Sequence, residues 1–169
     1  MKIVLIGMMG SGKSTVGRLL AGRLKLRFFD SDKMIEKERG KTVSEIFEAE
    51  GEGAFRSLEK TVIRRLMDED HAVVATGGGA PLSDENWKAF GDSAVVWLKC
   101  GAQSLFKRME RGGGSTRPLL KDAFSMEKIS GILKDREKFY RKAGFTVETD
   151  ELEPEETAEK IVRLLSVKP

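Results

Sequence analysis

Short apolar segments alternate along the chain with stretches in which apolar residues recur every three or four positions. The first segment, Lys2–Ile6, is almost continuously apolar, and from Lys13 to Leu24 apolar residues follow helical spacing. A short run that is apolar on both faces predicts a strand buried between two layers, and the helical spacing predicts an amphipathic helix. The alternation is typical of α/β proteins, in which helices flank a parallel sheet.

Later segments repeat this alternation. Further strands are expected at 27–29, 72–75, 94–98 and 145–149, and helices at 32–39, from Thr42, from Ala102, at 126–142 and from Pro154. Thr42 and Glu45 have the spacing of a capping box, and the glycines at 51 and 53 interrupt the helix that follows. We find no internal repeat or linker and therefore expect a single domain over residues 1–169.

Composition narrows the class of protein. Of 169 residues, 40% are hydrophobic and 34% charged, which favours a folded, water-soluble domain. The net charge of +3 without a basic run argues against a nucleic-acid partner, and no apolar stretch approaches the roughly 20 residues of a membrane span. The one cysteine, Cys100, excludes an internal disulfide, so we expect a cytoplasmic protein. The run at the start lacks a cleavage site, which argues against a signal peptide, and a monomer is the default expectation.

A glycine-rich segment lies between the first strand and the first helix. Its sequence, GMMGSGKS at 7–14, matches G-x-x-x-x-G-K-[ST] in the context that such a phosphate-binding loop requires. Glycines let backbone N–H groups surround phosphate oxygens, a lysine reaches the terminal phosphates, and a serine hydroxyl binds Mg²⁺. The alternative, a glycine turn that merely joins the strand to the helix, is disfavoured because strand, motif and helix follow one another directly. The expected ATP-binding residues here are Gly10, Ser11, Gly12, Lys13, Ser14 and Thr15.

Two polar clusters follow later strands, at the sheet edge where ligands bind in open parallel sheets. Asp30 and Asp32 come after the second strand; Asp30 could orient Mg²⁺ through water, and Asp32 could accept or align the proton of the acceptor's hydroxyl group. An Asx turn or a helix cap is the alternative. Gly77, Gly78 and Gly79 follow the third strand and suggest close approach of the backbone to a ligand, with a flexible turn as the alternative.

Three arginines are candidates on weaker local grounds. Arg56 and Arg136 lie on predicted helices, where a surface charge or a helical ion pair is the ordinary interpretation. Arg117 follows three glycines in a stretch at about 111–123 that resembles a mobile lid, and there it could cover a transferring phosphoryl group or simply be solvated.

Taken together, these motifs resemble those of shikimate kinases over nearly the whole chain. The motifs that carry the resemblance are the 7–14 loop, FDSD at 29–32, EGAFRSLE at 52–59, TGGG at 76–79, RPLL at 117–120, and 136–140. The loop alone is common to many kinases, whereas the ordered set is much more specific.

The resemblance implies transfer of the γ-phosphate of Mg-ATP to the 3-hydroxyl of shikimate, in aromatic amino-acid biosynthesis. It also implies a nucleoside-kinase-like sandwich with a five-stranded parallel sheet in the order 2-3-1-4-5. The implied roles are catalysis by Lys13, Asp32 and Arg117; ATP binding by the loop with Arg108 and Arg117; metal support by Ser14 and Asp30; and shikimate binding by Asp32, Arg56, Arg136 and Gly77 to Gly79.

Two departures and three competitors accompany this resemblance. The lid stretch leaves open whether Arg108 or Arg111 meets adenine, and Glu151-Leu152-Glu153 stands where some members carry a basic side chain. A kinase for another hydroxy acid, such as gluconate, and a non-catalytic nucleotide-binding relative are the alternatives. A GTPase is disfavoured because the sequence has neither N-K-x-D nor D-x-x-G.

Overall fold

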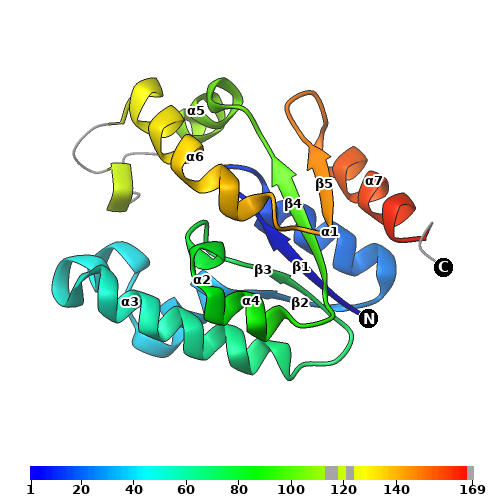
Figure 1. Cartoon of the computed structure of the whole chain (residues 1–169), viewed down its shortest axis with the longest axis horizontal. Helices are drawn as coiled ribbons and strands as arrows, with labels where there is room; N and C mark the ends of the chain where they lie inside the picture. Colours follow the sequence, from blue (N-terminus) through cyan, green and yellow to red (C-terminus); the bar gives the residue numbers. More distant parts are fainter. Residues whose placement is uncertain (113–117, 121–123, 167–169) are drawn as a thin grey trace.

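A computed structural model describes residues 1–112, 118–120 and 124–166 of the chain (Figure 1). Its centre is a five-stranded sheet in the order β2-β3-β1-β4-β5, with every neighbouring pair parallel. The strands are β1 (Lys2–Ile6), β2 (Arg27–Asp30), β3 (Ala72–Ala75), β4 (Ala94–Lys99) and β5 (Phe145–Glu148). The strand order implied by the family resemblance is therefore confirmed, and the predicted strand bounds hold to within one residue.

Helices cover both faces of the sheet. They are α1 (Lys13–Leu24), α2 (Ser31–Arg39), α3 (Val43–Met67), α4 (Asp84–Phe90), α5 (Ala102–Arg111), α6 (Met126–Tyr140) and α7 (Pro154–Ser166), with short 3₁₀ turns η1 (Ala80–Leu82) and η3 (Pro118–Leu120). Helices α1 and α7 lie side by side on one face, and α3, α5 and α6 lie on the other (Figure 1).

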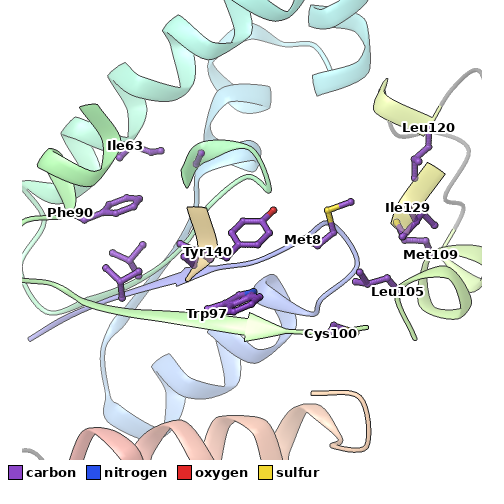
Figure 2. Close-up of a cluster of buried hydrophobic side chains, with 14 residues drawn as sticks. Met8, Ile63, Phe90, Trp97, Cys100, Leu105, Met109, Leu120, Ile129 and Tyr140 are labelled. Carbon is purple, nitrogen blue, oxygen red and sulfur yellow. The ribbon is translucent and has the colours of Figure 1, made fainter. Parts of the chain in front are cut away.

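Alternating residues of β1 supply two separate cores. Ile3 and Leu5 pack with α1 and α7, whereas Val4 and Ile6 pack with residues of α3, α5 and α6. All four side chains are fully buried, as the continuous apolar pattern of this strand predicts. Figure 2 shows the second core, in which Tyr140 lies beside Trp97.

Helix α3 changes direction at Gly51. Its N-terminus carries the predicted capping box of Thr42 and Glu45, and Gly51 adopts φ 82° and ψ 168°, outside the helical region. The kink brings the rings of Phe47 and Phe55, on its two sides, to a centroid distance of 4.9 Å. The predicted interruption is therefore confirmed: two helical stretches of α3 meet at the non-helical Gly51.

The structure contains two short elements that were not predicted, and it describes only part of the predicted lid. Helix α4 and the turn η1 were not expected, because seven and three residues are too few to show a helical apolar stripe. Most of the proposed lid at 111–123 lies outside the described residues, although Leu120 is buried in the second core. In the described part of the chain, no helix is long and apolar enough to cross a membrane.

Candidate active site

The loop between β1 and α1 has the backbone of a phosphate cradle. Gly7, Gly10 and Gly12 all have positive φ, at 145°, 79° and 90°. A side chain at Gly7 would also be blocked, since its Cβ would lie 2.6 Å from the Leu98 carbonyl oxygen. Lys13 Nζ donates hydrogen bonds of 2.9 Å to the carbonyls of Gly7 and Met8. The lysine is thus held across the cradle, where a phosphate could replace those carbonyls as its partner.

Ser14, in the first turn of α1, and Asp30, at the end of β2, bring two side-chain oxygen atoms together. The Ser14 hydroxyl donates to Asp30 Oδ2 at 2.5 Å, and Asp30 Oδ1 caps α2 by accepting from the Lys33 amide at 3.2 Å. The helix cap foreseen as an alternative therefore coexists with the possible metal role. A hydroxyl beside a carboxylate suits a hard cation such as Mg²⁺ that also binds phosphates and water. The described residues hold no group of three or more His, Cys, Asp or Glu side chains suited to a metal.

A cleft beside the cradle is suited to a nucleotide. It is lined by the loop glycines and Thr15, by α5, and by the segment after β5, including Arg108, Arg111 and Glu151 to Pro154. Arg108 Nη2 donates to the Thr149 carbonyl at 2.5 Å, which fixes its guanidinium at the end of β5. Arg111 lines the same cleft without that anchor, so only Arg108 is held in place by the described contacts.

Asp150 stabilises this wall of the cleft. Its carboxylate accepts a hydrogen bond of 2.9 Å from the Gly101 amide, which joins the ends of β4 and β5. The pKa of Asp150 lies below its usual range: partial burial acts to raise it, but hydrogen bonds from Ser104 and the Gly101 amide outweigh that effect. The group is therefore ionised at neutral pH.

A second cavity collects the predicted acceptor residues. Asp32, Arg56, Arg136 and the three glycines at 77–79 all line it, with an apolar wall from Met9, Val43, Phe47, Phe55, Pro118 and Leu119. Residues from four distant parts of the sequence therefore meet around one space. Arg117 lies outside the described residues.

Glu59 connects the two arginines, and sequence reasoning did not include it in the site. Glu59 Oε2 accepts from Arg56 Nη1 at 2.8 Å, and Arg56 also contacts Glu52 at 3.1 Å. Glu59 is 1% exposed and Arg136 6% exposed. Burial raises the pKa of Glu59, against the opposing effect of the Arg56 and Arg136 charges. One buried carboxylate thus faces two guanidinium groups, which leaves N–H donors for an anionic ligand.

The glycine turn fits closely against these groups. A Cβ at Gly77 would lie 2.6 Å from both Asp32 Oδ1 and Glu59 Oε1. At Gly79 it would lie 2.5 Å from Cζ of Arg56. No side chain fits at either position without displacing a charged group. The close approach of this turn to a ligand stays a prediction.

Comparisons with known proteins agree on one family. The family model for shikimate kinase matches residues 9–166. The chain is 41% identical over 163 residues to a shikimate kinase of Caldicellulosiruptor bescii, covering 96% of this chain and 94% of the relative. It is 43% identical to that of Gloeobacter violaceus over 98% and 93% of the two chains.

Solved structures show the same relationship. Shikimate kinase from Acinetobacter baumannii, in complex with shikimate, superposes with a TM-score of 0.92 at 38% identity, over 98% of this chain and 92% of that one. A deoxyadenosine kinase from M. mycoides, at 18% identity and a TM-score of 0.68, shares the fold alone. With a family model that spans almost its whole length and relatives this similar, the chain belongs to the shikimate kinase family.

Proposed function

We propose that this chain transfers the γ-phosphate of ATP to the 3-hydroxyl of shikimate, giving shikimate 3-phosphate and ADP. The observation that carries the proposal is that the two cavities adjoin along the loop. Met9 lines the acceptor cavity, and the next residue, Gly10, lines the nucleotide cleft. A phosphoryl group held at the cradle therefore faces an acceptor bound beside Arg56 and Arg136, which is the arrangement that direct transfer requires.

Different side chains of the acceptor cavity suit different parts of shikimate. Arg56 and Arg136 are positioned to bind its carboxylate, since a planar guanidinium forms paired hydrogen bonds with a carboxylate. Asp32 lines the same cavity and is the candidate to orient the hydroxyl and accept its proton. The hydroxyl oxygen forms the new bond to phosphorus, the bond from the γ-phosphorus to the bridging oxygen breaks, and ADP leaves with the negative charge.

The cradle residues act on the donor. We expect Lys13 Nζ to exchange the Gly7 and Met8 carbonyls for phosphate oxygens when ATP binds. A divalent cation, proposed to be Mg²⁺, would neutralise charge on the phosphates, with Ser14 and Asp30 as its protein partners. Arg108 is the candidate for stacking on the base, and Arg117 for contacting the phosphates from the lid.

An ADP-release assay with purified protein tests this function. We expect turnover with ATP and shikimate that requires a divalent cation and is lost with EDTA, and no turnover with gluconate. Turnover with gluconate but not with shikimate would show that the acceptor is a different hydroxy acid. ATP binding without turnover of either compound would favour the non-catalytic alternative. Monomeric state, cytoplasmic location and the absence of a nucleic-acid partner stay predictions; light scattering tests the first.

A further inference from the structure

Four of the six backbone N–H and C=O groups of the glycine turn, Gly77 to Gly79, have hydrogen-bond partners within the described residues. The Gly77 carbonyl accepts from the Ala80 amide at 3.1 Å and the Gly79 carbonyl from the Leu82 amide at 3.0 Å. In the described part of the chain, the amides of Gly78 and Gly79 have no such partner. Buried backbone groups are almost always paired, so these two N–H groups are the ones left for a ligand.

The remaining two groups of the turn are held by side chains. The Tyr140 hydroxyl donates to the Gly78 carbonyl at 2.6 Å, and the Gly77 amide donates to the Ser31 hydroxyl at 3.1 Å. Tyr140 and Ser31 are both 0% exposed. Each comes from a segment that also supplies the acceptor cavity: Ser31 precedes Asp32, and Tyr140 follows Arg136 by one helical turn on α6.

Contacts of both its ring and its hydroxyl hold Tyr140 in place. Its ring packs against Trp97 in the second core, with centroids 5.8 Å apart (Figure 2). The Arg136 guanidinium interacts with the same hydroxyl. Burial raises the pKa of Tyr140 despite that neighbouring charge, so the hydroxyl stays protonated and able to donate at neutral pH.

We propose that Tyr140 and Ser31 are positioning residues that hold the glycine turn, so that the Gly78 and Gly79 amides and the Arg136 guanidinium present their N–H groups to one anionic group of the acceptor. This inference rests on the proposed function insofar as it identifies that group as the carboxylate of shikimate. Neither residue lines the acceptor cavity, and both act through the turn.

Tyr140→Phe tests the proposal because it keeps the ring in the core and removes only the hydroxyl. Losing one buried hydrogen bond that orients a ligand should raise the KM for shikimate about tenfold, while the KM for ATP stays within about twofold. Ser31→Ala should likewise raise the KM for shikimate but not the KM for ATP, and it replaces Tyr140→Phe as the test if that variant folds poorly. Trp87→Phe is the matched control, because it removes a 2.8 Å hydrogen bond to the nearby Pro81 carbonyl, outside the acceptor cavity.

Amide hydrogen exchange of residues 76–80 in the ligand-free protein measures the turn without turnover. We expect faster exchange in Tyr140→Phe than in wild type, and no change from Trp87→Phe beyond any shared loss of global stability. An unchanged shikimate KM, an equal rise in both KM values, or unchanged exchange would overturn the positioning role. Inactivity of the wild type toward shikimate would instead refute the proposed function, and the exchange comparison would still decide the role of Tyr140.

Discussion

Gly79→Ala should disable one arginine of the acceptor cavity without straining the backbone. Gly79 has φ −96° and ψ −7°, a conformation with negative φ that alanine can also adopt, so the backbone itself contributes little to the effect. The new Cβ would lie 2.5 Å from Arg56 Cζ, whereas ordinary contact begins at 3.4 Å, a shortfall of about 0.9 Å. The Arg56 side chain is 23% exposed and can move outward, away from the cavity.

The magnitude follows from what that displacement breaks. Arg56 Nη1 lies 2.8 Å from Glu59 Oε2, so a shift of this size ends the hydrogen bond and removes the guanidinium from the acceptor. A hydrogen bond to a charged group contributes about 1.5–3 kcal/mol, which corresponds to about 10- to 150-fold in affinity. We expect the KM for shikimate to rise by that factor and the KM for ATP to stay unchanged.

Steady-state kinetics with each substrate varied in turn is the assay. Gly131→Ala is the control, because Gly131 lies in α6 with nothing within 4 Å of its would-be Cβ. That variant should keep both KM values and gain about 0.5–1 kcal/mol of stability from alanine's higher helix propensity. A Gly79→Ala enzyme with a wild-type KM for shikimate would refute the argument that Arg56 must remain against this turn.

Three further predictions concern the charged residues of the cavity. Asp32→Ala should abolish turnover while ATP still binds, as calorimetry would show; wild-type turnover would remove Asp32 from the mechanism. Arg136→Ala should raise the KM for shikimate about 10- to 150-fold, with little effect on that for ATP, and an unchanged acceptor KM in steady-state kinetics would contradict carboxylate binding. Because burial raises the pKa of Glu59, the folded state holds its proton more tightly than the unfolded state. The stability this group contributes is therefore present below pH 4.5, the ordinary value for glutamate, and is lost as pH rises through the raised pKa. Urea unfolding across that range should show a flatter pH dependence in Glu59→Gln; equal slopes would argue against the shift.

The parts of the fold that sequence predicts are those with local signals. The 7–14 loop is recognisable because its backbone conformation requires glycines at positions of positive φ, and a lysine and a serine follow them directly. Strands β1, β3 and β4 are recognisable because both of their faces are buried, and the capping box marks the start of α3 in the sequence.

The parts that sequence misses depend on tertiary contacts. Arg56 with Glu59 has the spacing of an ordinary surface ion pair on a helix, and only burial of Glu59 beside Arg136 distinguishes it. Nothing in the sequence around Tyr140 indicates that its hydroxyl contacts Gly78, which is 62 positions away.

The shared boundary at Met9 and Gly10 has a consequence for inhibitor chemistry. Because one peptide unit separates the walls of the two cavities, a single molecule that joins a phosphate mimic to a cyclic carboxylate could occupy both with a short, stiff linker. Tethering converts the second binding event into an intramolecular one, and its effective concentration is highest when the tether matches the span. Such a bivalent compound would not need to contact the part of the nucleotide cleft proposed to bind adenine. Many nucleotide-binding proteins have a comparable adenine site.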